Sequence, residues 1–173
     1  MLRDVMEIRP IEPDECGALG QITVSAYRQL FSADSLGDYE EELANVEARR
    51  LDSEVYVAVD HAVLVGGVTY VPDAQRAMSE FDDPEAAGIR MLAVNPSHQG
   101  HGAGRALLEA CIARARSDRR ARIVLHSTPV MVVAQAMYVR AGFVRAPDLD
   151  VFYDGEPYSE DAPLHLISYV LSL

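Results

Sequence analysis

The sequence predicts an α/β fold of the α+β kind, in which helices flank a mixed, mostly antiparallel central sheet. Three observations lead to this prediction. Strand-like and amphipathic helical runs alternate along the chain. Strand signals at 55–59 and 63–71 are separated only by Asp60-His61-Ala62, a hairpin turn that requires antiparallel pairing. A glycine-rich loop joins an apolar strand at 89–94 to a helix at 104–116, a connection typical of α/β units.

The first half of the chain begins with a strand at 7–10, which ends at a proline that cannot donate to a sheet ladder. A helix at 15–30 follows Asp14, a good N-cap residue, and carries an apolar stripe. A second helix at 38–50 is acidic at its start and arginine-rich at its end, as the helix dipole favours. The hairpin strands described above come next.

The second half alternates strands with helices. Arg90 alone interrupts the apolar run of the strand before the glycine loop, and Gly142 is placed to end the last helix as its C-cap. These elements complete a sheet of about six or seven strands flanked by about four helices. We expect strands at 89–94, 123–125, 143–144 and 166–173, and helices at 104–116 and 130–141.

The composition is that of one ordinary domain spanning 1–173. Hydrophobic residues make up 49% of the chain and charged residues 24%. No segment approaches the roughly 18 uninterrupted apolar residues of a membrane span. The N-terminus carries charged residues and lacks the apolar core of a secretory signal. We therefore expect a cytoplasmic protein with no membrane partner.

The charge balance limits the partners. A net charge of −12 argues against nucleic-acid binding, because phosphate backbones are bound by clustered lysine and arginine. Excess acid can equally serve only to keep the protein in solution. Cys16 and Cys111 lie in helical patterns without metal-ligand spacing, so we expect buried thiols and no metal. The sequence does not decide whether the protein forms a homodimer.

Three alternating glycines, Gly100, Gly102 and Gly104, stand between a strand and a helix. Such a loop presents unpaired backbone N–H groups together with the positive end of the helix dipole, which favours a phosphate. The dinucleotide fingerprint fails, because Arg105 stands where its third glycine belongs. The P-loop also fails, because no Gly-Lys-Ser/Thr is present. A nucleotide-binding protein of either type is therefore disfavoured.

The motif that does fit is Gln-Gly-x-Gly-x-Gly, which begins at Gln99 and is preceded by Leu92-Ala93-Val94-x-Pro96. It resembles the acetyl-CoA-binding motif of the GNAT superfamily of N-acetyltransferases. Downstream, Ala134-x-x-x-Tyr138-x-x-x-Gly142-Phe143 resembles that family's second conserved helix and the strand after it. The resemblance covers essentially the whole chain. It implies the GNAT fold, with strands splayed apart at the acetyl-CoA site.

The resemblance also implies how acetyl-CoA, the co-substrate, is held. The pantetheine arm is expected along the strand at 89–94, and the pyrophosphate on the glycine loop. The cofactor-binding residues implied are Leu92, Ala93, Val94, Gln99, Gly100, His101, Gly102, Ala103, Gly104, Arg105, Ala134 and Tyr138. Met131 stands where relatives often carry an asparagine, so an asparagine contact is not expected here.

Acetyl transfer to an amine needs a neutral amine, a stabilised oxyanion and a proton for the leaving thiolate. Tyr138 matches the family's general acid, and a backbone N–H near Ala93 or Val94 is the implied oxyanion donor. Some relatives carry a glutamate base on the strand before the loop, but 89–94 has no carboxylate. The remaining candidates are Glu85, acting directly or through water, and His126.

The first hypothesis is therefore an acetyltransferase that moves the acetyl group of acetyl-CoA to an amine, on a small molecule or a protein, by direct attack in a ternary complex. The alternative is a non-catalytic acyl-CoA-binding or sensing domain. The acidic segment 72–87 favours a cationic acceptor if it lines the site. If it is only a solvated loop, the acceptor site is expected near Tyr27 and Tyr39.

Overall fold

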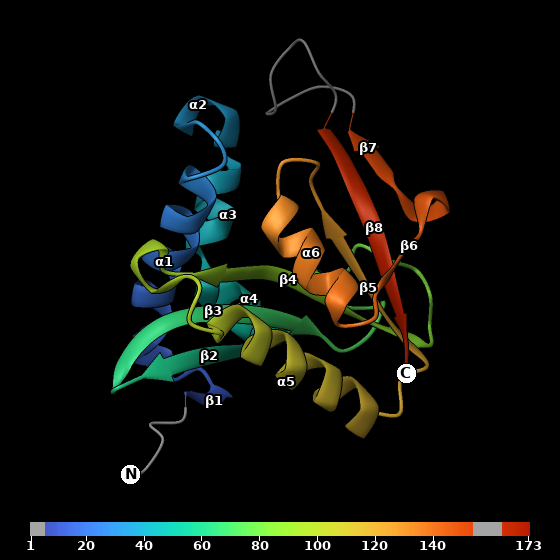
Figure 1. The fold of residues 1–173 in the computed structure, drawn as a ribbon, viewed down its shortest axis with the longest axis horizontal. Coiled ribbons are helices and arrows are strands. Elements are labelled where there is room, and N and C mark those ends of the chain that lie inside the picture. Colours follow the sequence, from blue (N-terminus) through green and yellow to red (C-terminus); the bar gives the residue numbers. More distant parts are fainter. Residues whose placement is uncertain (1–5, 154–163) are drawn as a thin grey trace.

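The computed structural model describes residues 6–153 and 164–173 (Figure 1). Its strands are β1 (Glu7–Pro10), β2 (Glu54–Asp60), β3 (Val63–Val71), β4 (Ala86–Val94), β5 (Arg122–Ser127), β6 (Val144–Arg145), β7 (Val151–Tyr153) and β8 (Leu164–Ser172). They form an eight-stranded sheet in the order β1-β2-β3-β4-β5-β8-β6, and β7 pairs with β8. Every pairing is antiparallel except that of β4 with β5. The predicted mixed, mostly antiparallel sheet is confirmed.

The helices of the described ranges are α1 (Cys16–Arg28), α2 (Ala33–Leu36), α3 (Tyr39–Ala44), α4 (Val46–Asp52), α5 (Ala103–Ser117) and α6 (Val132–Arg140). Three short 3-10 turns accompany them: η1 (Pro13–Glu15), η2 (Pro96–His98) and η3 (Pro147–Leu149). The predicted helix at 38–50 is broken at Asn45, whose side chain accepts a hydrogen bond from Ala48 N at 3.1 Å and caps α4. None of these helices is long and apolar enough to cross a membrane.

Helices cover both faces of the sheet. Along β2, Val57 packs in the same cluster as Leu19 of α1, whereas the next residue, Ala58, faces the core beneath α5. This alternation is expected of a strand that is buried on both sides. α6 lies over β5 and β8 on the α5 face (Figure 1), where the rings of Tyr138 and Tyr169 are 6.2 Å apart. The sheet is thus a layer between α1 and the α5–α6 pair.

The parallel strands β4 and β5 pair only over Ala86–Ile89 and Arg122–Leu125. β4 then continues to Val94, and on its β5 side it has no further strand partner among the described residues. The separation coincides with a bulge, because Met91 has a φ of +51° and the β3 register shifts at this point. A bulge bends its strand and increases the local twist. The expected splay is therefore present, and it begins after Ile89.

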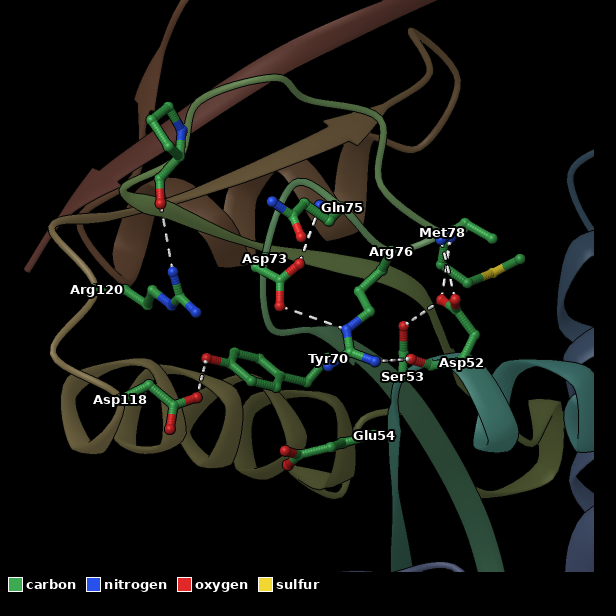
Figure 2. Close-up of polar contacts among 12 residues, drawn as sticks. Asp52, Ser53, Glu54, Tyr70, Asp73, Gln75, Arg76, Met78, Asp118 and Arg120 are labelled. Carbon is green, nitrogen blue, oxygen red and sulfur yellow. Dashed lines mark hydrogen bonds and ion pairs between the residues drawn. The ribbon is translucent and has the colours of Figure 1, made fainter.

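The acidic segment between β3 and β4 is fixed to the sheet. The carboxylate of Asp52, at the end of α4, accepts hydrogen bonds from Ala77 N at 2.9 Å and Met78 N at 3.1 Å (Figure 2). Phe81 lies against Gly88 of β4, where an added Cβ would be 2.5 Å from its ring. Two distant contacts therefore position residues 79–81 over the sheet.

Two glycines of α1 allow a matched test of how this helix packs. A Cβ at Gly20 would lie 2.5 Å from the backbone oxygen of Ala44, whereas a Cβ at Gly17 would meet nothing within 4 Å. We expect Gly20→Ala to lower the free energy of unfolding by about 1–3 kcal/mol, because backbone must move. Gly17→Ala should raise it by up to about 1 kcal/mol through helix propensity. Urea unfolding followed by circular dichroism measures both, and equal effects would contradict the close α1–α3 approach.

Candidate functional site

The glycine loop connects β4 to α5 through two left-handed residues. Gly100 has a φ of +83° and Gly102 a φ of +91°, and an added Cβ at either would meet nothing within 4 Å. Conformation rather than space therefore requires glycine at these positions. Gly104 differs, because its φ is ordinary and an added Cβ would lie 3.6 Å from both Leu92 Cδ2 and Met137 Sδ. Gly104 thus lies where β4, α5 and α6 meet.

The loop leaves backbone donors free. The first hydrogen bond into α5 runs from Ala106 N to Gly102 O at 3.0 Å, so the N–H groups of Ala103, Gly104 and Arg105 come before it. Gly102 offers no side-chain cap. Within 6–153 and 164–173 these three N–H groups have no acceptor. Such a helix start combines unpaired donors with the positive end of the dipole and can bind an anion.

The side chains of the loop have different tasks. Gln99 donates from Nε2 to Val94 O at 3.2 Å and to Gln29 Oε1 at 3.0 Å, so it ties the loop to β4 and to the end of α1. His101 is exposed, with Nδ1 at 3.3 Å from His98 O. Arg105 is exposed and pairs with Glu109 at 2.7 Å. The loop is therefore held by Gln99, while His101 and Arg105 are open to solvent beside the free donors.

The far side of the splay carries two unsatisfied hydroxyls. Ser127 and Thr128, at the end of β5, are only 3% and 9% exposed, and neither side-chain oxygen has a partner in the part of the chain that the structure describes. A buried polar group without a partner costs about 1–3 kcal/mol. Leu92 and Val94 pack against the core on the other side of the opening, and Ala93 is buried. The splay thus combines apolar walls with unused hydrogen-bonding groups.

Tyr138 lies on α6 one turn after Ala134, and its ring is 5.9 Å from that of Phe143. Burial raises the pKa of its hydroxyl, and Tyr27 and Cys111 add to this shift. The hydroxyl donates to no acceptor among the described residues. Tyr138 is therefore protonated at neutral pH and free to donate. Met131, where an asparagine contact was not expected, is the half-buried N-cap residue of α6.

A partly buried ion cluster lies at the start of the splay, on the face of the sheet opposite α6. Glu80 contacts Arg90 Nη2 at 3.0 Å through Oε1 and His126 Nδ1 at 3.4 Å through Oε2. Burial raises the pKa of Glu80, but the hydrogen bond with His126 and the charge of Arg90 outweigh it, so the pKa lies below its usual value. Glu80 is therefore ionised. The sequence analysis predicted only an acidic loop here. The signal that it missed is the pairing of Phe81 with Gly88, because the Phe81 ring packs against that glycine of β4.

The two predicted base candidates lie in different places. His126 is the first β5 residue after the last β4–β5 pair, and its side chain is 6% exposed. Glu85 comes just before β4, at the closed end of the paired stretch; its side chain is 70% exposed and pairs with Arg122 at 3.2 Å. The structure brings His126, but not Glu85, to the start of the splay. No group of three or more His, Cys, Asp or Glu in the described ranges could hold a metal.

Tyr27 and Tyr39, the other acceptor region considered, lie on this same face. Their rings are 6.2 Å apart, and they pack around Met91, the bulge residue of β4. Burial raises the pKa of both hydroxyls. The electrostatic influence of Glu80 reaches both tyrosines. The two acceptor regions are therefore adjacent.

Comparison with known proteins shows the family. The model of the acetyltransferase (GNAT) family matches residues 18–143. No curated protein sequence matches the chain. Among solved structures, a putative acetyltransferase, yncA, from Salmonella typhimurium with acetyl-CoA is 23% identical, with a TM-score of 0.69 over 97% of this chain and 94% of that one. The ribosomal-protein-S18-alanine N-acetyltransferase of Escherichia coli is 20% identical, with the same TM-score and coverage. A GCN5-related N-acetyltransferase from Rhodopseudomonas palustris reaches a TM-score of 0.73 at 18% identity over 100% and 99%.

The ion cluster predicts a pH-dependent contribution to stability. Because the pKa of Glu80 is lowered in the fold, its stabilising effect is complete above the unfolded pKa and is lost as the pH falls. We expect Glu80→Gln to lower the free energy of unfolding at pH 7, and the difference from wild type to shrink between about pH 5 and about pH 3. Urea unfolding at several pH values measures this difference. A difference that does not change with pH would contradict the ionised pair.

Proposed function

Because the chain belongs to the GNAT acetyltransferase family, we propose that it transfers an acetyl group from acetyl-CoA to an amine by direct attack in a ternary complex. One observation carries the proposal. The unpaired edge of β4 leads directly into the glycine loop and the free N–H groups at the start of α5. This continuous line of backbone donors suits a long ligand that ends in a pyrophosphate.

The residues present fit acetyl-CoA. The N–H groups of 100–105 would bind the pyrophosphate, with His101 and Arg105 beside it. The free edge of Leu92–Val94 would hold the pantetheine arm by sheet-like hydrogen bonds. Ser127 and Thr128 supply buried hydroxyls that would take the place of the absent asparagine. Acetyl-CoA supplies the activated acetyl group.

The chain's own groups then carry the transfer. A proton leaves the ammonium, and the neutral nitrogen forms a bond to the acetyl carbon. The carbon–sulfur bond then breaks, and the nitrogen loses a second proton, which restores the general acid. A backbone N–H near Ala93 or Val94 would stabilise the oxyanion. Tyr138, which is protonated and unpartnered, would give its proton to the departing thiolate. No metal takes part in this scheme.

The names of two relatives support an amine as the acceptor. The Escherichia coli relative is named for the alanine of ribosomal protein S18, and a Brucella melitensis relative is a ribosomal-protein-alanine N-acetyltransferase. Both names imply acetylation of an amine. We extend that chemistry to this chain, with a small amine or a protein N-terminus as acceptor and the cytoplasm as the compartment.

Tyr138→Phe tests the transfer. We expect turnover to fall by roughly ten- to a thousandfold, because the general acid is lost, while the dissociation constant of acetyl-CoA stays within about threefold. Thiol release measures turnover and calorimetry measures binding. Gly102→Val is the binding counterpart: a β-branched residue resists the φ of +91°, so acetyl-CoA affinity should fall.

The outcomes separate the two hypotheses. A wild-type protein that binds acetyl-CoA but transfers no acetyl group to any amine of a broad panel would support the non-catalytic alternative. Full affinity in Gly102→Val would remove the glycine loop from the site. Unchanged turnover in Tyr138→Phe, with chemistry shown to limit the rate, would leave Tyr138 only a packing role.

A further inference from the structure

A pocket of about 360 Å³ lies between the β3–β4 segment and the sheet face opposite α6. The apolar lining comes from Val124 of β5 and Val170 of β8, here called the floor, and from Phe81 and Leu149, here called the walls. The charged lining comes from Glu80, Asp82, Asp83, Arg122 and His126. This size is at the lower end of the range for small-molecule sites, which is about 300–1,000 Å³.

The pocket ends at the splay. Arg122, Val124 and His126 alternate along β5, so they point to one face, and His126 is the member that lies beyond the last β4–β5 pair. Arg90 is the first β4 residue past the same point. Glu80 contacts both of these residues. The Glu80–His126 end of the pocket therefore adjoins the opening in which the thioester is proposed to lie.

His126 is held between two acceptors. Nδ1 is 3.4 Å from Glu80 Oε2, and Nε2 is 3.4 Å from Leu149 O. Leu149 O also accepts a hydrogen bond from Ser168 Oγ at 2.6 Å, which fixes this wall. A neutral imidazole can donate to only one of the two acceptors, whereas an imidazolium can donate to both. The two contacts therefore hold the imidazole ring of His126 between Glu80 and Leu149.

The charges of the lining select the ligand. Three carboxylates face the pocket against one arginine, which pairs with Asp83 at 2.7 Å. Glu80 is balanced by Arg90, and Asp82 is left as an excess negative charge. A cation is attracted to such a site and an anion is repelled. The apolar floor and walls suit a hydrocarbon stem rather than a second charge.

We propose that this pocket is the acceptor site and that it takes a primary amine on an apolar stem. The inference rests on the proposed function and deepens it. The ammonium donates to Glu80, and its proton passes to the Glu80–His126 pair. The neutral nitrogen then attacks the acetyl carbon, the carbon–sulfur bond breaks and the thiolate takes a proton from Tyr138. The second proton that the nitrogen loses on becoming an amide restores the Tyr138 hydroxyl. Arg90 is a positioning residue that holds Glu80 at the opening.

The probe is phenethylamine, compared with phenylalanine, which adds a carboxylate to the same stem. We expect the kcat/KM of wild type for phenethylamine to be at least about tenfold higher than its kcat/KM for phenylalanine. Glu80→Gln should lower the kcat/KM for phenethylamine by about a hundredfold or more. Val170→Phe should raise its KM by about tenfold by filling the floor. The acetyl-CoA dissociation constant should stay within about threefold in both variants.

The matched controls lie at the β2–β3 hairpin. Asp60→Asn removes a half-buried carboxylate, and Val63→Phe enlarges a valine that is 51% exposed. Both lie away from the pocket, so their kcat/KM for phenethylamine should stay within about twofold of wild type. Failure of wild type to bind acetyl-CoA would refute the proposed function. If Glu80→Gln and Val170→Phe acetylate phenethylamine as well as the control variants do, the pocket proposal is refuted while the proposed function stands. Preference for phenylalanine, or for a peptide N-terminus with neither small amine acetylated, would also overturn the pocket proposal.

Discussion

The rest of the site depends on the separation of β4 from β5. Parallel strands normally continue their ladder to the end, because each unpaired backbone group loses a hydrogen bond. Here the ladder stops at Ile89 and Leu125, and β4 continues for five residues, 90–94, with no partner on that side in the part of the chain that the structure describes. The left-handed Met91 bends β4 away from β5. The proposed site lies along this unpaired edge of β4.

The opening gathers groups whose hydrogen-bonding capacity the fold does not use. The α5 donors, the hydroxyls of Ser127 and Thr128 and the phenol of Tyr138 all lack partners in the described ranges. The hydroxyls of Ser127 and Thr128 are also buried, and an unsatisfied buried group costs about 1–3 kcal/mol, so this pair indicates a place that a ligand completes. On the other face, Glu80 and His126 are paired with each other. The two faces of one opening thus differ: one carries hydrogen-bonding groups that the fold does not use, and the other carries an ion pair.

Much of this arrangement could be predicted from local sequence. The glycine spacing predicted the loop and the start of α5. The apolar run at 63–71 predicted both ends of β3. These features depend on residues close together in the chain. The break at Asn45 was missed although Asn45 is a good N-cap, because the charge pattern across 38–50 favoured one helix.

Other features depend on contacts between distant residues. Glu80 reaches His126 only because Asp52 holds the segment before it and Gly88 leaves room for Phe81 after it. No local pattern reports such contacts. For the same reason the sequence could not separate Glu80 from Glu85, which lies five residues later in the same acidic segment but pairs with Arg122 on the surface.

Hydrogen exchange of the backbone amides, with and without saturating CoA, tests the account most directly, because it reports which N–H groups the ligand engages. The account predicts slower exchange along the free edge of β4 at Leu92 and Val94 and at the start of α5, from Ala103 to Arg105. The amides of β1 and β2 should keep their rates. CoA that binds without slowing exchange at these positions, or that protects a different part of the sheet, would contradict the claim that the splay and the glycine loop form one binding site.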